Sequence, residues 1–391
     1  MNLHEYQAKD LLSGFGVPLP AGDVAQSSSA AQNVARRLPG ERYVVKAQVQ
    51  AGGRGRAGGV KIVDSVAEVR QAAEDLLGQT LVTEQTGPEG RSVRAVYVEE
   101  AIASERDIYV AVLVDRQSGR VALIGAKQGG EDIEERAAAN PSIIHTLLLK
   151  PDGVPVKGTF PAFAKKIGLT GPLSAKAVKL FEGLISAFLK NDASLIEINP
   201  LAVTASNDLV ALDVKMVIDD NALFRHPEMR NFRDRDELDP VELQAQENEI
   251  NYVRMDGDIG VVVNGAGLAL ATHDMLSDVG GVPANFMDIR TTATSLDIAA
   301  GFDLLLSNPN VAAVLVNVHG GGMQRCDTIA EGIGISMKRN DRTVPLVVRF
   351  AGNNADYGHT LLRNYGIAYT EAQDMGDGIE RVVALVRPEA A

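Results

Sequence analysis

Lys46 stands near the end of an apolar stretch, 43–49, and the glycine-rich segment AGGRGRAGG follows it at 51–59. Glycines let backbone N–H groups approach phosphate oxygens without an intervening side chain, and Arg54 and Arg56 add positive charge. A P-loop carries its lysine and a hydroxyl residue after the glycines, at a helix start, whereas this segment joins two expected strands. The pattern predicts a phosphate-binding flap, and a flexible hairpin with solvated arginines is the alternative.

A second group of polar residues lies in the stretch LIEINPLAVTASNDLVALDVKM, which predicts a β-hairpin. With the turn centred on Ser206, Asn199 lies opposite Asp213. Glu197 then lies opposite Lys215, on the same face, because alternate side chains of a strand share a face. Carboxylate and amide oxygens suit Mg²⁺, which also takes oxygens from nucleotide phosphates. We expect a magnesium site here, with a Glu197–Lys215 salt bridge as the alternative.

Two glycine turns in the second half of the chain form a third candidate. The turn 264–267, NGAG, is similar to a dinucleotide fingerprint, and Asp288 lies downstream, so a nicotinamide site is a competing interpretation. The turn 319–323, HGGGM, can bind an anion at a helix start. His319 is either a phosphoryl acceptor or acid–base group, or a residue that only forms hydrogen bonds.

The elements that must position these residues follow from periodicity. In the first half we expect helices at 5–12, 29–38, 66–77 and 174–189, and strands at 43–49, 60–63, 93–100, 108–115, 121–126, 195–204 and 209–216. The strands at 93–126 are expected to form a run of antiparallel neighbours. The polar stretch 231–249 predicts a linker and then a helix, so we place a domain boundary near residue 238, which gives domains 1–238 and 239–391.

After the boundary, five expected strands alternate with helices. The strands lie at 259–264, 284–289, 312–318, 344–350 and 367–370. This alternation predicts a doubly wound parallel sheet. Ligands of such sheets bind at the carboxyl ends of the strands, which is where the turns 264–267, 290–294 and 319–323 fall.

Composition narrows the function. The formal net charge of −13 over 391 residues disfavours general binding to nucleic acid. No apolar run is long enough to span a membrane, and the N-terminal residues predict neither a signal peptide nor a presequence. Cys326 is the single cysteine, which favours the cytoplasm; we expect it to be a small residue at a helix start rather than a nucleophile.

Taken together, the motifs resemble those of the beta subunit of succinyl-CoA synthetase, the succinate–CoA ligase family that also includes malate–CoA ligase. The likeness extends nearly from end to end. The segments that carry it are NLHEYQAKDLL, VVKAQVQAGGRGRAGGVK, LVTEQTGP, LIEINPL, DDNALFR, NYVRMDGDIG, VNGAGLALAT, PANFMDI, VLVNVHGG and RCDTIAEGI. The resemblance implies an N-terminal ATP-grasp domain and a flavodoxin-like ligase domain.

The resemblance also implies roles for particular residues. ATP would be bound by Lys46, Gly53, Arg54, Gly55, Glu99, Ile102 and Asp107, the last where the family has a glutamate. Mg²⁺ would be held by Asn199 and Asp213, as the hairpin pattern indicates. The acid and the partner's active region would contact Asn264, Gly321, Gly322 and Met323. Glu197 would steady a phosphorylated histidine of an alpha subunit, which also provides the coenzyme A site.

Two departures from the family pattern lie where the acid and the phosphohistidine should meet. Three family glycines are replaced by the residues Arg290 to Thr292, and a family phenylalanine by His319. We expect Arg290 to adapt the site to another di- or tricarboxylate, since guanidinium binds carboxylate in a two-donor fork. Drift in a paralogue is the alternative.

The reaction expected is ATP-driven ligation of a small carboxylic acid to coenzyme A, in complex with the alpha subunit. Two other interpretations remain at this point. A nicotinamide-dependent dehydrogenase would leave the Lys46 flap and the hairpin unexplained. A subunit that binds nucleotide without catalysis is favoured only by Arg290 and its neighbours.

Overall fold

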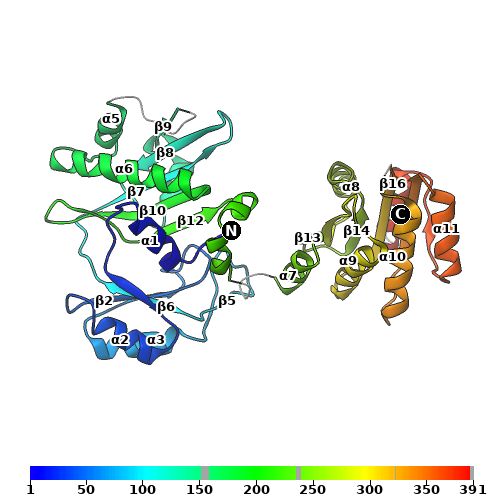
Figure 1. The fold of residues 1–391 in the computed structure, drawn as a ribbon, viewed down its shortest axis with the longest axis horizontal. Helices are drawn as coiled ribbons and strands as arrows, with labels where there is room; N and C mark the ends of the chain where they lie inside the picture. Colours follow the sequence, from blue (N-terminus) through cyan, green and yellow to red (C-terminus); the bar gives the residue numbers. More distant parts are fainter. Residues whose placement is uncertain (151–157, 235–238, 322, 388–391) are drawn as a thin grey trace. The chain divides into compact units, whose positions relative to one another are not determined.

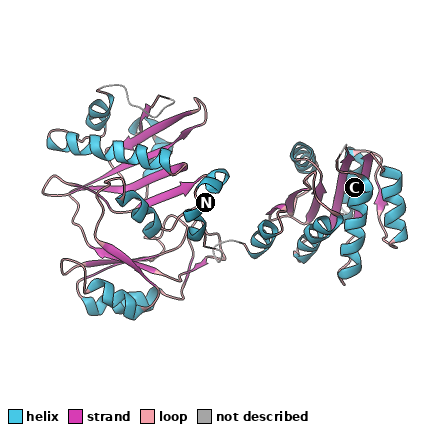
Figure 2. Cartoon of the chain, viewed as in Figure 1, coloured by secondary structure: helices cyan, strands magenta, loops and turns pink. Residues whose placement is uncertain are grey.

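The structure, a computed structural model, describes residues 1–150, 158–234, 239–321 and 323–387. The chain divides into two units, Met1–Glu237 and Leu238–Ala391, and each is described by itself. Figure 1 shows the elements in chain order, and Figure 2 shows that both units mix helices and strands.

A four-stranded antiparallel sheet of the first unit has the order β1-β6-β2-β3. Its strands are β1 (Gly22–Ala25), β2 (Tyr43–Ala47), β3 (Val60–Val63) and β6 (Val96–Glu100). Helices α2 (Ser28–Ala35) and α3 (Val66–Leu76) pack together on one face, as Figure 1 shows, and share a buried core with it. Ser27 and Ser65 cap these helices by accepting backbone N–H groups.

A larger antiparallel sheet of the same unit has the order β11-β10-β7-β8-β9, and β12 pairs with β10. Its strands are β7 (Arg106–Asp115), β8 (Arg120–Ala126), β9 (His145–Leu148), β10 (Ala193–Val203), β11 (Leu209–Ala211) and β12 (Val214–Ile218). Helices α1 (Glu5–Ser13), α5 (Thr159–Lys166) and α6 (Pro172–Lys190) bury apolar side chains against it. The smaller elements are α4 (Ile133–Ala139), η1 (Pro141–Ile143), η2 (Asp220–Arg225), η3 (Pro227–Phe232) and the two-stranded sheet of β4 (Thr80–Leu81) and β5 (Arg91–Ser92).

One expected neighbourhood was wrong. The strand predicted at 93–100 forms as β6, but it pairs with β1 and β2 rather than with β7. Of the three strands expected to be antiparallel neighbours, only the last two, β7 and β8, pair with each other. Strand β6 is therefore the last one of the smaller sheet along the chain and not the first one of the larger sheet, which local periodicity does not reveal.

The described residues of the second unit form a sheet with the order β13-β15-β14-β16-β17-β18. The strands are β13 (Asn251–Arg254), β14 (Ile259–Val263), β15 (Asn285–Asp288), β16 (Ala313–Gly320), β17 (Leu346–Gly352) and β18 (Thr370–Glu371). The five predicted strands are parallel, and their order 2-1-3-4-5 is that of the flavodoxin-like folds. The sixth strand, β13, was not predicted and pairs antiparallel at the edge.

Helices cover both faces of this sheet. Helices α9 (Ser295–Ser307), α10 (Cys326–Arg339) and α11 (Ala355–Asn364) share one core with it, and α8 (Ala266–Asp278) and α12 (Met375–Val386) share the other. The short helix α7 (Pro240–Glu247) precedes β13. Strands β14, β15 and β16 end at 263, 288 and 320, so the predicted turns do lie at the carboxyl edge.

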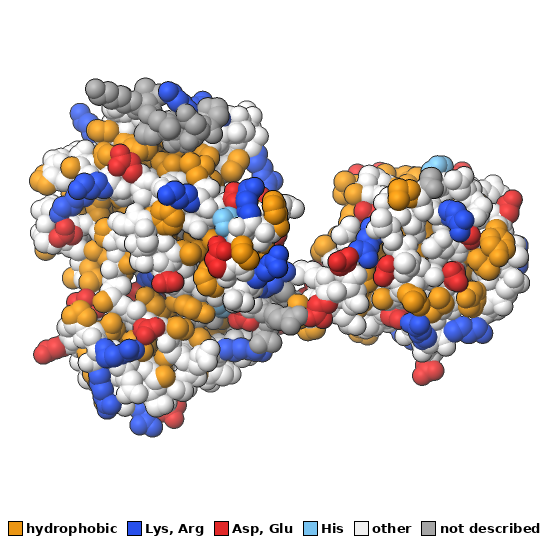
Figure 3. Space-filling model, viewed as in Figure 1, with side chains coloured by type: hydrophobic (Ala, Val, Ile, Leu, Met, Phe, Trp, Pro, Cys, Tyr) orange, Lys and Arg blue, Asp and Glu red, His pale blue; other side chains and the backbone are white. Residues whose placement is uncertain are grey.

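On the visible face of both units, Lys and Arg side chains are interspersed with Asp and Glu side chains (Figure 3). Among the described residues, no helix combines the length and apolar character needed to cross a bilayer. Cys326 is buried at the first position of α10, as expected, and burial raises the pKa of its thiol.

We predict that Phe181→Ala lowers the free energy of unfolding of the first unit by about 3–5 kcal/mol. Phe181 is fully buried and meets the rings of Phe160 and Phe163 edge-on, with centroids 5.8 and 5.5 Å away. Urea unfolding followed by circular dichroism measures this loss. Phe224→Ala is the matched control, because Phe224 is 72% exposed; equal losses in the two variants would contradict the assignment of the core.

Candidate functional site

Lys46 lies on β2 with its ammonium group surrounded by oxygens. Its Nζ is 2.8 Å from Glu5 Oε1 and 2.7 Å from Glu99 Oε1. It also donates to the backbone oxygen of Leu212 at 2.7 Å. Burial acts to lower the pKa of Lys46, but the carboxylates of Glu5, Glu99 and Asp213 outweigh it, so the pKa is raised. Lys46 is therefore a fixed positive charge.

Arg54 is buried, although the alternative interpretation of the flap placed it in solvent. Its Nη1 donates to the backbone oxygen of Ala47 at 2.9 Å. Its Nη2 donates to Glu5 Oε2 at 2.7 Å and to Asp213 Oδ1 at 2.8 Å. Burial acts to lower the pKa of Arg54, and Asp213 and Glu5 outweigh that effect and raise it. The second arginine, Arg56, remains on the surface, as that alternative predicted.

The glycines on either side of Arg54 give the flap its path. Gly53 has φ +75°, in the left-handed region that favours glycine. The N–H of Gly59 donates to the backbone oxygen of Arg54 at 2.8 Å, which closes the loop. A Cβ on Gly55 would lie 2.2 Å from Glu131 Oε1. The flap thus bends tightly enough to direct Arg54 inward.

The hairpin has the predicted register. Glu197 pairs with Lys215, and the N–H of Asn199 donates to the backbone oxygen of Asp213 at 3.1 Å. The turn region is centred on Ser206, because Val203 pairs with Leu209. Asn199 and Asp213 are therefore direct neighbours.

Each side chain of this pair keeps an oxygen lone pair that a cation could use. Asn199 Oδ1 accepts the N–H of Gly130 at 2.7 Å and has a second lone pair. Asp213 Oδ1 accepts a hydrogen bond from Arg54, and the Asp213 side chain is 44% exposed. Among the described residues, no cluster of three or more His, Cys, Asp or Glu side chains could cage a metal alone. The pair fits a hard cation that completes its shell with water and phosphate oxygens.

Glu197 lies on the same face of the sheet as Asn199. Burial raises the pKa of Glu197, and the nearby Glu134 and Asp213 add to the rise, whereas Lys215 and a hydrogen bond from Tyr109 oppose it. A shift of this kind is typical of functional carboxylates. Glu197 and Lys215, the alternative salt bridge, do not form an ion pair; Lys215 donates to Gln85 Oε1 at 3.3 Å, and its charge acts on Glu197 without direct contact.

The structure brings most of the predicted nucleotide residues together, but not all of them. Lys46, Arg54, Glu99 and Asp213 form one contiguous cluster. Ile102 follows β6 in an irregular segment and is half-buried. Asp107 lies at the start of β7, exposed, and accepts the hydroxyl of Ser104 at 2.6 Å. Neither side chain forms a hydrogen bond or an ion pair with the side chains of the cluster.

Two residues of this cluster were missed by sequence reasoning. Glu5 and Lys9, on α1, have side chains that are 1% and 2% exposed. Their spacing of four residues puts them on one helical face. In the sequence, the two residues appear as an oppositely charged pair on an amphipathic helix. Charged residues usually lie on the solvated face of such a helix, so the pair did not indicate a buried site.

In the second unit, side chains fix the turns at the carboxyl edge of the sheet. Asn264 Nδ2 donates to the backbone oxygen of His319 at 2.7 Å, and its Oδ1 accepts the N–H of His319 at 2.9 Å. Asp288 Oδ1 accepts the N–H of Gly265 at 2.5 Å. In a nicotinamide site this carboxylate would hold the ribose, so its use inside the turn counts against the dehydrogenase interpretation.

The remaining predicted substrate residues surround the second turn. Gly321 donates its N–H to the backbone oxygen of Gln324 at 3.0 Å, and its own oxygen accepts from Asn353 at 3.2 Å. Met323 is 72% exposed. Gly322 lies outside the described residues.

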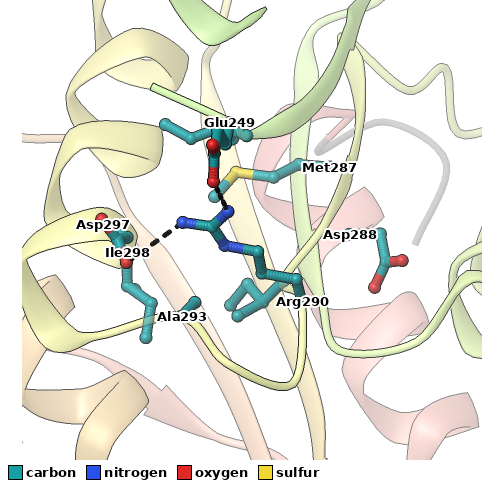
Figure 4. A pocket seen from close by; sticks show the side chains of 9 residues that line it. Glu249, Met287, Asp288, Arg290, Ala293, Asp297 and Ile298 are labelled. Carbon is teal, nitrogen blue, oxygen red and sulfur yellow. Dashed lines mark hydrogen bonds and ion pairs between the residues drawn. The ribbon is translucent and has the colours of Figure 1, made fainter. Parts of the chain in front are cut away.

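Arg290 faces two carboxylates of its own unit (Figure 4). Its Nη1 is bound to Glu249, and its Nη2 is 3.4 Å from Asp297 Oδ2. Asp297 also forms the capping box of α9 with Thr294. Glu249, Met287, Arg290 and Asp297 are among the residues that line a small pocket. Arg290 therefore joins Glu249, in the segment between α7 and β13, to the start of α9.

Comparison with known proteins extends this description. Residues 2–203 match the family model of the ATP-grasp domain, and residues 262–383 match that of the CoA-ligase domain. A solved structure of ATP citrate lyase from Methanothrix soehngenii, in complex with citrate and coenzyme A, is similar with a TM-score of 0.74. It covers 99% of both chains at 16% identity, and it supports the fold.

Other known proteins have a much higher sequence identity to this chain than that structure has. The chain is 46% identical over 387 residues to the succinate–CoA ligase [ADP-forming] subunit beta of Janthinobacterium sp. strain Marseille, with 98% of each chain covered. It is 44% identical over 391 residues to the subunit of the same name from Staphylococcus aureus strain JH9, covering 99% of this chain and 100% of that one. The protein therefore belongs to the succinate–CoA ligase beta-subunit family, the ATP-grasp enzymes that ligate an acid to coenzyme A.

Proposed function

We propose that this chain binds ATP with Mg²⁺ and passes the terminal phosphoryl group to a histidine of a partner alpha subunit. That histidine then activates succinate, or a related di- or tricarboxylate, for ligation to coenzyme A. The observation that carries the proposal is the meeting of the buried cations Lys46 and Arg54 with the partly exposed Asp213 in one cluster. The names of the relatives support the partner and the acid.

The basic end of the cluster would receive the phosphates. Lys46 and Arg54 keep their charge at any working pH, because the pKa of each is raised. Charges that are already in place need no rearrangement when negative charge shifts during phosphoryl transfer. The backbone N–H groups of the flap, at Gly53 and Gly55, would add donors around the phosphate oxygens.

Asn199 and Asp213 would hold Mg²⁺. When bound, the cation neutralises phosphate charge during transfer. Asp213 lies next to Arg54, so its position links the cation to the basic end of the cluster. The Asn199 side chain is held in place by the N–H of Gly130, which donates to its Oδ1.

Glu197 would orient the partner's histidine. A carboxylate accepts the N–H of one imidazole nitrogen and leaves the other nitrogen free to attack the γ-phosphorus. The bond from that phosphorus to the ADP oxygen then breaks as the phosphorus–nitrogen bond forms. The phosphoryl group next passes to the acid, and the thiol of coenzyme A displaces it as phosphate.

The second unit would supply the acid and partner contacts. Asn264, Gly321 and Met323 lie at or beside the carboxyl edge of its sheet. Four large apolar side chains are exposed near the starts of the helices at that edge: Leu270, Leu296, Met323 and Tyr357. An exposed apolar group of this kind suits contact with another protein. We further propose that the enzyme acts in the cytoplasm, where its single thiol stays reduced.

We predict that Asp213→Asn raises the Mg²⁺ concentration needed for half-maximal ATP binding by about tenfold or more, because a charged ligand is lost. Calorimetric titration of Mg²⁺ at fixed ATP measures this change. Asp208→Asn, in the same hairpin and paired with Lys176, is the control and should titrate as the wild type does. An unchanged midpoint in Asp213→Asn would remove this residue from the metal site.

We predict that Glu197→Gln lowers kcat of the complex by about two orders of magnitude and leaves ATP affinity unchanged. The wild-type rate should fall as the pH decreases through the raised pKa of Glu197, at a higher pH than for an ordinary glutamate, since only the ionised form fully accepts the imidazole N–H. This acidic limb should disappear in Glu197→Gln. Glu182→Gln, on the exposed face of α6, should keep both the wild-type rate and its decrease at low pH.

An acid panel tests the function as a whole. The chain, purified with its co-purifying partner, should release ADP only when coenzyme A and a suitable acid are both present. Because Arg290 is already bound to two carboxylates, we propose that it does not select the acid, and we expect the same order of acids in Arg290→Gly. A changed order would restore the selective role expected from sequence, and no release with any acid would refute the ligase proposal.

A further inference from the structure

Helix α1 contributes two buried charges to the nucleotide cluster. Glu5 and Lys9 face inward from successive turns, and Glu5 Oε1 lies 2.8 Å from Lys9 Nζ. Lys9 also binds Glu99 and donates to the backbone oxygen of Leu212 at 2.8 Å. Its ammonium group lies over the ring of Tyr97. Helix α1 is thus joined to β6 of the smaller sheet and to the hairpin of the larger one.

Glu5 is the centre of this arrangement. Its two carboxylate oxygens serve three cations: Lys9 and Lys46 at Oε1, and Arg54 at Oε2, 2.7 Å from Nη2. Burial acts to raise the pKa of Glu5, but the charges of Lys46, Lys9 and Arg54 hold it well below the usual value. Glu5 therefore remains a carboxylate at the pH at which the enzyme works.

A carboxylate in this place does not bind phosphate, because like charges repel. What Glu5 does is hold the two cations that we assign to phosphate. Lysine and arginine side chains are long and lose considerable freedom when fixed. A residue that fixes them before the ligand arrives lowers the cost of binding. Lys9 stabilises Glu5 in turn, because its ammonium group adds a third positive charge beside the buried carboxylate.

Glu5 also differs from Asp213 in what it can do during binding. Both carboxylates hold Nη2 of Arg54. Asp213 is 44% exposed and is assigned to the cation, whereas the side chain of Glu5 is 1% exposed and is enclosed by protein. If a bound cation drew Asp213 away from Arg54, Glu5 would be the anion that still holds the guanidinium.

We propose that Glu5 is a positioning residue for the nucleotide phosphates, acting through Lys46 and Arg54, and that Lys9 supports it. This inference rests on the proposed nucleotide and metal site. It differs from a purely structural ion pair, which would stabilise the fold without affecting ligand affinity. It also differs from a simple charge effect, because removal of a negative charge alone would tighten the binding of ATP.

The test is Glu5→Gln in the full chain with its partner, titrated calorimetrically with Mg²⁺-ATP. We expect the dissociation constant to rise at least fivefold, while kcat at saturating ATP stays within about twofold of the wild type. Asp192→Asn is the matched control, since Asp192 also binds two basic side chains, Arg225 and His226, but outside the cluster. It should leave the dissociation constant unchanged.

Each other result of this experiment has a defined meaning. An unchanged constant with a lower melting temperature would assign Glu5 a structural role only, and a smaller constant would make it a competitor of phosphate; either overturns the inference. If Glu5→Gln fails to fold, Glu5→Asp replaces it: charge is kept but reach is shortened, and we expect a smaller rise in the constant, with no rise overturning the inference. A wild type that does not bind Mg²⁺-ATP would overturn the proposed function itself.

Discussion

Buried charges have to be neutralised locally, and in the first unit this requirement is met by six side chains from five segments. Glu5 and Lys9 come from α1, Lys46 from β2, Arg54 from the flap, Glu99 from β6 and Asp213 from the hairpin. An unpaired ion in such a place costs several kcal/mol. None of the segments can shift without exposing its neighbours' charges to this penalty, so charge balance sets the geometry of the nucleotide-binding half.

The second unit meets a different requirement, with single side chains in place of a buried charge cluster. Its turns lie at the edge of a parallel sheet, where they must stay open to ligands and yet keep their shape. Asn264 holds the turn at His319 through two backbone hydrogen bonds, and Asp288 holds the turn at Gly265 through one. Arg290 fixes the start of α9. The division matches the chemistry proposed for each half, with charge handled in one unit and the acid and partner in the other.

Much of this could be predicted from the sequence, for reasons that differ between elements. The hairpin register followed from strand alternation and a turn at Ser206, because both are local properties. The doubly wound parallel sheet followed from alternating strands and helices, whereas its flavodoxin-like character was implied by the family resemblance. The partners of β6 could not be predicted, since pairing between distant strands depends on the whole chain. The edge strand β13 is short and mostly exposed, so it lacks the apolar pattern that marks a strand.

The charged residues were the hardest to interpret. Glu5 and Lys9 have the spacing of a surface pair on an amphipathic helix, and only the partners from other elements turn them inward. Arg290 carries a positive charge that suits an acid substrate, but in the structure Glu249 and Asp297 form ion pairs with it. Sequence gives the charge of a residue, whereas its partner is decided by packing. The comparison with relatives identifies the family but does not remove this ambiguity for single residues.

The oxygen of Leu212 has a consequence for how this protein tolerates change. Two ammonium groups converge on a peptide carbonyl rather than on a side chain, so any amino acid that keeps the backbone path at position 212 supplies the same acceptor. A mutational scan that exchanges one side chain at a time would record this position as permissive. An insertion or deletion that moved the peptide group would instead disturb both lysines at once.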